Sequence, residues 1–155
     1  MAAIFMGLYI CYNKESNKYI KMIKKPKINE IKEIKKLVDS SKEMDIIEES
    51  FSLDYYERIL DKGILLIAEE NNKIVGVCFG TYNKKEKWAD LLGLIVRKEF
   101  RKRGVGSGLV KKFERTCKKY KLKTIDLYSD KLQLNLFRKL KYKQGRIYIS
   151  FRKKL

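Results

Sequence analysis

The sequence predicts a single α/β domain built on a mixed β-sheet. Short apolar runs typical of buried strands alternate with stretches in which apolar residues recur at helical spacing. The chain has 155 residues, 45% of them hydrophobic and 36% charged. This size and composition fit one domain with its own core, and they argue against a disordered or membrane-spanning chain.

The first half of the chain is divided by Pro26, Gly63 and two polar turns. Alternating residues before Pro26 predict a strand, and isoleucines at helical spacing after it predict a helix. A second helix ends at Gly63, and two apolar runs joined by a polar turn then form a hairpin. The expected elements are a strand at 19–24, helices at 28–38 and 53–62, and strands at 64–68 and 74–82.

The second half begins with a nearly apolar run that predicts a central strand. A long amphipathic helix follows, with one apolar stripe opposite a lysine-rich face. The expected elements are a strand at 88–96, a helix at 104–121, a strand at 125–128, a helix at 132–140 and a strand at 146–151. The complete order is β-α-α-β-β-β-α-β-α-β, a mixed α/β sheet.

Residues 1–21 are expected to be an N-terminal extension that could add a strand, and residues 22–155 the domain. The apolar run at 1–11 lacks a positively charged start and is too short to span a bilayer. We therefore expect neither a signal peptide nor a membrane anchor. The three cysteines, far apart and odd in number, indicate no disulfide framework and no metal-ligand spacing. A cytoplasmic protein without a metal is expected.

Positive charge is concentrated in the second half. The chain carries 37 Lys and Arg against 19 Asp and Glu, a net charge of +18. Residues 97–155 hold 21 of the basic and 4 of the acidic residues, and so +17 of that charge. Such asymmetry points to an anionic partner, which could be nucleic acid, a membrane surface or a polyphosphate ligand. Lysine-rich composition without any partner is the alternative.

The chain contains no histidine. This excludes histidine general bases, Ser-His and Cys-His nucleophiles, and zinc sites with histidine ligands. The glycine-rich turn VRKEFRKRGVGSGL, between the apolar strand and the amphipathic helix, remains the most informative segment. Glycines let a ligand approach the backbone, and the first amides of a helix form an anion site. The spacing matches neither a Walker motif nor a dinucleotide fingerprint, so the turn predicts a different pyrophosphate cradle.

This turn resembles motif A of the GNAT superfamily of acetyl-CoA-dependent N-acetyltransferases. The residues that carry the likeness are Leu94-Ile95-Val96, Phe100, and Arg101-x-x-Gly104-x-Gly106. The segment 136–142 is similar to the F-Y-x-K-L-G-F block of that family, and the predicted order of elements also agrees. The resemblance implies a splayed central sheet and direct transfer of an acetyl group to an amine.

The resemblance also implies which residues bind acetyl-CoA. The pantetheine arm would lie along the strand at Leu94, Ile95 and Val96, and the pyrophosphate would lie on the turn. Asn135, near the position of a family asparagine that is Asp130 here, is a further candidate. The expected turn residues are Arg101, Lys102, Arg103, Gly104, Val105, Gly106 and Ser107.

For the catalytic base there are two candidates. Asp126 lies in Ile125-Asp126-Leu127, which looks like the L-E-V of ribosomal-protein alanine N-terminal acetyltransferases, where the glutamate is the base. Asp90 lies on the central strand and is expected in phase with Leu92 and Leu94. A water chain from backbone carbonyls is a third option.

The family's tyrosine acid is Phe137 here and its glycine is Lys141, so the proton for the CoA thiolate must come from elsewhere. Tyr128 and Tyr142 are expected to be packing residues.

The acceptor is expected to be a primary amine of a protein or peptide. Acidic residues in the segment 40–53 would favour a cationic acceptor. The alternatives are a basic nucleic-acid-binding module, a degenerate acyl-CoA-binding GNAT domain, and a small-molecule N-acetyltransferase acting on polyamines or antibiotics. The protein is expected to be a monomer or homodimer without membrane contact, and a nucleic-acid partner is the less favoured option.

Overall fold

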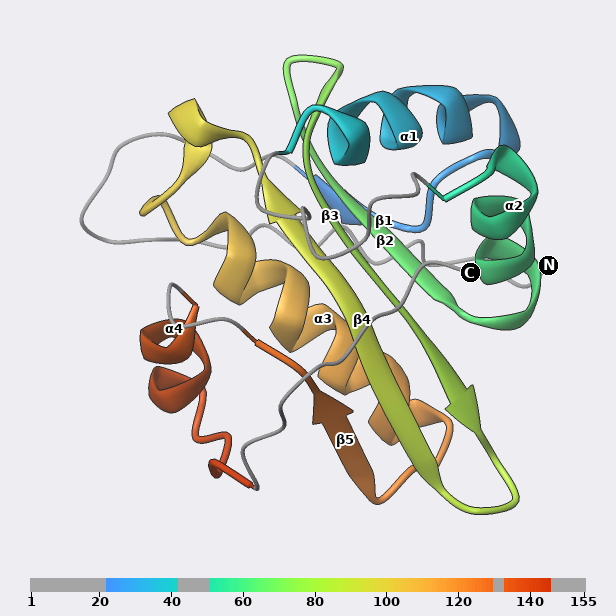
Figure 1. Cartoon of the computed structure of the whole chain (residues 1–155), viewed down its shortest axis with the longest axis vertical. Helices are drawn as coiled ribbons and strands as arrows, with labels where there is room; N and C mark the ends of the chain where they lie inside the picture. Colours follow the sequence, from blue (N-terminus) through green and yellow to red (C-terminus); the bar gives the residue numbers. More distant parts are fainter. Residues whose placement is uncertain (1–21, 42–50, 130–132, 146–155) are drawn as a thin grey trace, which may run out of the picture.

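The computed structural model describes residues 22–41, 51–129 and 133–145. Within these residues, five strands form one sheet in the order β1-β2-β3-β4-β5, and four α-helices cover its two faces (Figure 1). The first four strands pair antiparallel, whereas β5 pairs parallel with β4. The strands are β1 (Met22–Lys24), β2 (Ile64–Glu70), β3 (Lys73–Asn83), β4 (Trp88–Val96) and β5 (Thr124–Leu127). The helices are α1 (Ile31–Asp39), α2 (Leu53–Lys62), α3 (Val105–Lys119) and α4 (Leu134–Lys139), with the 3-10 turns η1 (Ile28–Glu30) and η3 (Lys98–Phe100).

This architecture confirms the mixed α/β fold class. The helix at 53–62 and the central strand at 88–96 have the predicted bounds, and the other described elements agree to within a few residues. One residue of the first helical pattern is not in the core, because Ile28 lies in η1 and is 61% exposed. The final strand at 146–151 and the extension 1–21 lie outside the described residues.

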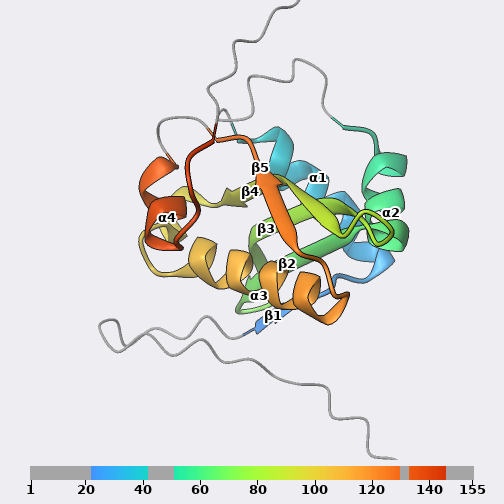
Figure 2. The ribbon, with the colours of Figure 1, turned by 90° about the horizontal axis from the view of Figure 1, so that it is seen from below.

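The sheet is a central layer between two helical layers (Figure 2). On one face α1 and α2 pack against β2 and β3, where Tyr56 and Phe79 are fully buried. On the other face α3 covers the sheet with the apolar stripe predicted from sequence, which includes Leu109 and Phe113. The β2–β3 turn is Asn71-Asn72, with φ of 51° and 60°, a geometry that asparagine tolerates and that suits a two-residue hairpin.

A β-bulge interrupts β4 in the middle of its pairing with β3. Phe79 pairs with Gly93 and Gly80 pairs with Leu91, so Leu92 is the extra residue without a partner on β3. Leu92 is 42% exposed. An extra residue in a strand moves every later side chain to the opposite face. Before the bulge, Ala89 and Leu91 face α3. After it, Leu94 and Val96 face α3, which is the face that even-numbered residues would not occupy in a regular strand.

In the described part of the chain, no helix is long and apolar enough to cross a membrane.

Candidate active site

The two strands that flank the candidate site separate beyond the bulge. Pairing between β4 and β5 extends from Trp88–Thr124 to Leu91–Leu127 and stops there. From the bulge onward β4 continues to Val96, and no described strand pairs with it on the side of β5. Figure 1 shows the chain leaving β5 towards α4 while β4 continues towards the turn before α3. The backbone of the last residues of β4 is thus accessible to a ligand on this side.

The glycine turn lies at the end of this opening. Gly104 is the N-cap of α3 and has φ of 82°, a left-handed conformation that favours glycine. The amide of Gly108 donates to the carbonyl of Gly104 at 2.9 Å and starts the helical hydrogen bonding. The amides of Val105, Gly106 and Ser107 precede it and lack acceptors inside the helix. Together with the dipole of this 15-residue helix, they form an anion site.

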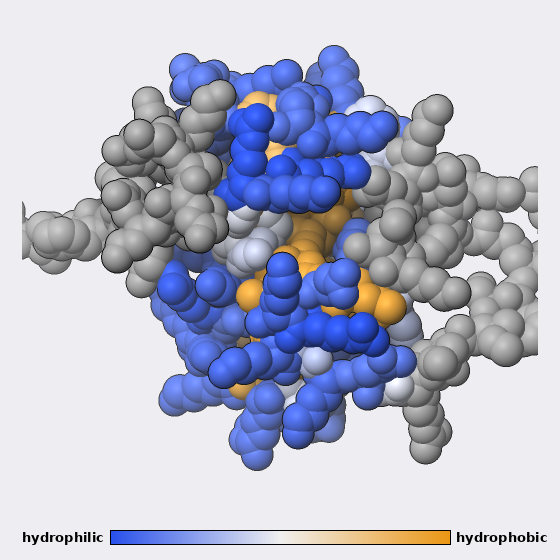
Figure 3. Space-filling view, turned by 90° about the vertical axis from the view of Figure 1, so that its left-hand side faces the viewer, coloured by the Kyte–Doolittle hydropathy of each residue, from blue (hydrophilic) through white to orange (hydrophobic). Residues whose placement is uncertain are grey.

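Gly106 faces the opening. A Cβ atom built on it would meet side-chain carbons of Leu136 at 3.6 Å and of Leu94 and Val96 at 3.8 Å. These three residues come from α4 and from the end of β4, so the glycine turn, the end of the strand and α4 meet here. Figure 3, seen from the side of α4 and η3, shows apolar surface in a hollow between hydrophilic residues above and below it.

The residues predicted to bind the cofactor do not all point the same way. Leu94 and Val96 face Gly106, whereas the Ile95 side chain is buried on the opposite face with the α1 and α2 cluster. Ile95 also pairs with Val77 of β3, so its backbone points away from the opening as well. Asn135 is exposed on α4, and it is the neighbouring Leu136 that faces the turn. Sequence reasoning missed Leu136. The apolar pattern of α4 points to the buried Phe137, and it gives no sign that the adjacent Leu136 faces the turn.

The basic residues of the turn have distinct positions. The Arg101 Nε donates to the carbonyl of Val96 at 2.9 Å, which ties the turn to the end of β4. The Arg103 guanidinium lies 5.3 Å from the centre of the Phe100 ring. Lys102 is exposed and has φ of 58°. The residues here fit a pyrophosphate: free helix amides, a glycine without a side chain in the way, and three cationic side chains.

The two candidate bases lie side by side. Asp90 on β4 is the parallel partner of Asp126 on β5, so both side chains project from the same face of the sheet. Ala89 and Leu91, which alternate with Asp90, pack into the α3 cluster. The two carboxylates therefore lie on the face opposite α3, one residue pair before the strands separate.

This arrangement corrects the predicted phase of Asp90. It was expected to share a face with Leu92 and Leu94, but Leu92 is the bulge residue and Leu94 faces α3. Past the bulge, Gly93 is the residue on the Asp90 face, where a side chain would clash with the Phe79 ring. The glycine inside this apolar strand was the sequence signal for a bulge.

The environment of the carboxylate pair changes the pKa of one of its members. Burial raises the pKa of Asp90 above its ordinary value, and the negative charge of Asp126 raises it further. Protonation of one carboxylate, or a cation placed between the two, relieves this repulsion. The pair can therefore accept a proton or hold an ammonium group.

The position expected for the acid is closed to solvent. Phe137 is 6% exposed and meets the Tyr142 ring edge-to-face at 5.5 Å between centroids. Burial raises the pKa of the Tyr142 hydroxyl, and Glu114 adds to this effect, so Tyr142 packs as predicted. Tyr128 does not pack as predicted. It directly follows β5 at the point of strand separation and is 79% exposed.

The described cysteines do not supply a nucleophile. Cys78 and Cys117 are buried free thiols, and burial raises the pKa of both, that of Cys117 to about 11. Thiols of this kind are unreactive at neutral pH. Among residues 22–41, 51–129 and 133–145, no group of three or more His, Cys, Asp or Glu side chains is placed to hold a metal ion.

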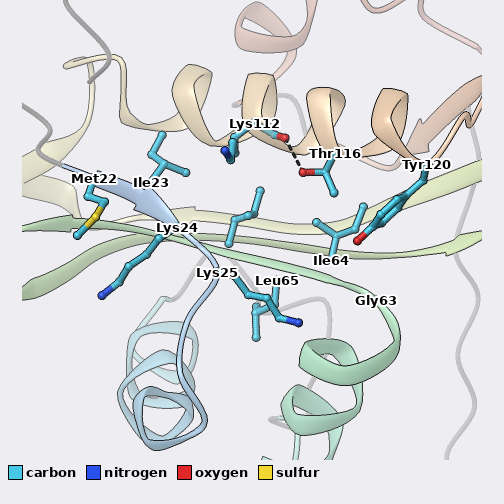
Figure 4. A pocket seen from close by; sticks show the side chains of 11 residues that line it. Met22, Ile23, Lys24, Lys25, Gly63, Ile64, Leu65, Lys112, Thr116 and Tyr120 are labelled. Carbon is cyan, nitrogen blue, oxygen red and sulfur yellow. Dashed lines mark hydrogen bonds between the residues drawn. The ribbon is translucent and has the colours of Figure 1, made fainter. Parts of the chain in front are cut away.

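A second hollow lies at the opposite edge of the sheet. It is lined by residues of β1, β2 and α3, among them Lys112, Thr116 and Tyr120 (Figure 4). The Thr116 hydroxyl donates to the carbonyl of Lys112 at 3.0 Å and is thus used within α3. This hollow contains neither the glycine turn nor the carboxylate pair, so it is not the candidate site.

Comparison with known proteins agrees with this geometry. The model of the acetyltransferase (GNAT) family matches residues 31–142. The chain belongs to the GNAT acetyltransferase family. Among curated proteins, no sequence matches the chain at a significant level. The match confirms the resemblance seen in motif A and identifies this GNAT protein as an N-acetyltransferase.

Solved structures show the same fold at low sequence identity. An aminoglycoside acetyltransferase from an uncultured soil metagenomic sample, in complex with sisomicin, is 18% identical, with a TM-score of 0.67 over 86% of this chain and 95% of its own. An aminoglycoside N-acetyltransferase in complex with CoA is 16% identical, with a TM-score of 0.69 over 86% and 99%. Ard1 from Thermoplasma volcanium is 18% identical, with a TM-score of 0.62 over 77% and 78%.

The acidic residues of the segment 42–50, predicted to favour a cationic acceptor, lie outside the described residues.

Proposed function

We propose that this GNAT protein transfers the acetyl group of acetyl-CoA directly to a cationic primary amine, and that the amine belongs to a protein or peptide. The observation that carries the proposal is the Asp90–Asp126 pair beside the opening between β4 and β5. An ammonium group placed there gains the attraction of two carboxylates that otherwise repel each other. It would also stand next to the end of the unpaired strand.

The turn at the start of α3 would hold the donor. The amides of Val105, Gly106 and Ser107 would bind the pyrophosphate, with Lys102 and Arg103 adding positive charge. The backbone of Leu94 and the amide of Val96, which point away from β3, would pair with the amide groups of the pantetheine arm. Acetyl-CoA supplies an activated acetyl group as a thioester, and its reactive end would then lie near the bulge.

The chemistry requires one proton acceptor and one proton donor. Asp90, whose pKa is raised by burial and by Asp126, takes the proton from the ammonium group. The amine nitrogen then forms a bond to the thioester carbonyl carbon, and the bond from that carbon to sulfur breaks. The unpaired backbone at Leu92 would stabilise the negative charge on the carbonyl oxygen. The exposed Tyr128 hydroxyl gives a proton to the departing thiolate, in place of the family tyrosine that Phe137 replaces. The nitrogen loses its second proton as the amide forms, and this proton restores the Tyr128 hydroxyl.

The choice of a protein or peptide amine rests on the likeness of the segment 125–127 to the L-E-V of ribosomal-protein alanine N-terminal acetyltransferases. The carboxylate pair would also accept a small polycation. A polyamine or aminoglycoside is therefore the second candidate acceptor.

The test is a thiol-release assay with acetyl-CoA and four acceptor classes: peptides with free N-termini, lysine peptides with blocked N-termini, polyamines and aminoglycosides. We expect release with one of the peptide classes, and a decrease in kcat of about 100-fold or more in Asp90→Asn. Asp61→Asn, which removes an exposed carboxylate on α2, is the matched control and should keep full activity. Turnover only with a small polycation would replace the proposed acceptor, and full activity of Asp90→Asn would remove Asp90 from the mechanism.

A further inference from the structure

The turn between β3 and β4 and the turn between α3 and β5 form one surface. The Lys123 amide donates to the carbonyl of Lys87 at 2.7 Å, which joins the two turns through their backbones. The rings of Tyr82 and Tyr120 also meet, with 5.0 Å between their centroids. Figure 1 shows both turns together at the lower end of the molecule. We call residues 83–87 and 118–123 the basic end.

The basic end has seven lysines and a single carboxylate, Glu86. All seven lysines are exposed, and none is in an ion pair with another described residue. The Lys84 ammonium lies over the Tyr120 ring, 4.9 Å from its centre. The lysines are Lys84, Lys85, Lys87, Lys118, Lys119, Lys121 and Lys123.

Bound acetyl-CoA would not account for this charge. The basic end adjoins Trp88 at the start of β4, and the glycine turn follows Val96 at the end of the same strand. Eight residue steps of strand separate these two ends by roughly 26 Å. The lysines of the basic end therefore need a different anion, or none.

Two of these lysines occupy positions that disfavour lysine. Lys87 has φ of 60° and Lys121 has φ of 58°, both in the left-handed region. At the end of α3 the amide of Leu122 donates to the carbonyl of Cys117, and the amide of Lys121 donates to the carbonyl of Lys118. These are the hydrogen bonds of a Schellman motif, in which the left-handed residue is usually glycine. A side chain in this conformation is strained, because its Cβ atom lies too close to the following carbonyl oxygen. Positive charge is thus present at two sites where local stability favours glycine or asparagine.

We propose that the basic end docks on the phosphate backbone of a nucleic acid. Lysine is a point charge suited to phosphates, and the basic end contains no arginine that could read base edges in a two-pronged contact. The large apolar side chains that are exposed in the described part are Ile28, Leu92 and Tyr128, and none belongs to the basic end. A membrane surface, which is bound through buried apolar groups as well as charge, fits less well.

The test measures binding of the full chain to fluorescein-labelled RNA and DNA duplexes of two unrelated sequences, by anisotropy across a range of salt concentrations. The test variant is Lys85→Gln with Lys87→Asn, Lys121→Asn and Lys123→Gln, in which asparagine suits the two left-handed positions. The control removes four exposed lysines elsewhere, by Lys32→Gln, Lys36→Gln, Lys62→Gln and Lys73→Gln, and has the same net charge. Thermal melting by circular dichroism verifies that both variants fold.

We expect the wild type to bind both sequences alike. The test variant should bind at least tenfold more weakly than the control at the same salt concentration, and its plot of log K against log salt should lose a slope of about 3 to 4. Equal weakening of both variants would overturn the proposal in favour of net charge alone. Absence of duplex binding by the wild type would also overturn it. The proposal would also be overturned if the wild type bound no duplex but bound vesicles with 30% phosphatidylserine, and the test variant lost this vesicle binding.

Discussion

Gly106→Ala should separate acetyl-CoA binding from folding. The added methyl group would meet Leu136, Leu94 and Val96 at 3.6 to 3.8 Å, ordinary van der Waals distances, so the folded chain can accommodate it. Gly106 is also the second residue of α3, and alanine in a helix is more stable than glycine by up to about 1 kcal/mol. We therefore expect an unchanged or higher melting temperature.

Binding should change in the opposite direction. If the pyrophosphate lies against the first amides of α3, the methyl group stands between ligand and backbone and lengthens the hydrogen bonds there. Loss of one charge-assisted hydrogen bond costs about 1.5 to 3 kcal/mol, which corresponds to a Kd raised about 10- to 100-fold. Gly106→Glu, which adds a negative charge, should abolish binding.

Calorimetric titration of acetyl-CoA, paired with thermal melting, measures both effects. Gly145→Ala is the matched control, because a Cβ atom there has no neighbour within 4 Å, and it should leave both quantities unchanged. Gly104→Ala differs again, since φ of 82° makes any side chain unfavourable, so this variant should lose about 1 to 2 kcal/mol of stability. Undiminished affinity in Gly106→Glu would refute the assignment of the turn to the pyrophosphate.

Four other predictions follow from the structure. Asp126→Asn removes the charge that raises the Asp90 pKa, so the acidic limb of the kcat/KM profile should move to lower pH. A raised pKa means that folded Asp90 binds its proton more tightly than the unfolded chain does, so its charge lowers stability above both pKa values. Asp90→Asn should therefore raise Tm at pH 7 and leave it unchanged well below the ordinary value of 3.8, as thermal melting at the two pH values would show. Tyr128→Phe should lower kcat and leave the KM for acetyl-CoA unchanged in steady-state kinetics, and an unaltered kcat would assign the proton to solvent. Lys141→Gly should raise Tm by about 2 to 4 °C, because Lys141 has φ of 65° at the end of α4.

The last of these predictions explains a departure from the family pattern. The amides of Lys141 and Tyr142 donate to the carbonyls of Arg138 and Phe137, which again are the hydrogen bonds of a Schellman motif. Glycine is the usual residue at the left-handed position, and the family block has glycine there. Lys141 preserves the backbone hydrogen bonds of this motif with a less favourable residue. Lysine at this position is therefore expected to lower local stability while the hydrogen bonds of the motif still form.

Local patterns predicted most of the fold. The helix 53–62 follows from the Ser52 cap, whose hydroxyl accepts from the Tyr55 amide at 3.2 Å, and from Gly63 at its end. The buried strands follow from apolar runs, and α3 from its stripe of apolar residues. Signals of this kind are contained in a few consecutive residues. The glycine turn was predicted for the same reason, since its glycines, basic residues and following helix are adjacent in sequence.

The carboxylate pair could not be predicted in the same way, because it depends on two properties that no short segment contains. Asp90 and Asp126 are partners only because β5 pairs parallel with β4 in one particular register. A shift of that register by one residue would place Asp126 on the face of α3.

The bulge at Leu92 then gives the pair its relation to the opening. In a regular strand Asp90 would share its face with Leu92 and Leu94, and the side chains that face Gly106 would lie on the same side as the carboxylates. The extra residue turns Leu94 and Val96 towards the turn and α4 while Asp90 stays on the face of α1 and α2. In the proposed mechanism, donor and acceptor would therefore approach the opening from opposite faces of one sheet. Deleting Leu92 should therefore abolish acetyl transfer even if the shortened strand still pairs with β3, which thiol release and circular dichroism would measure together.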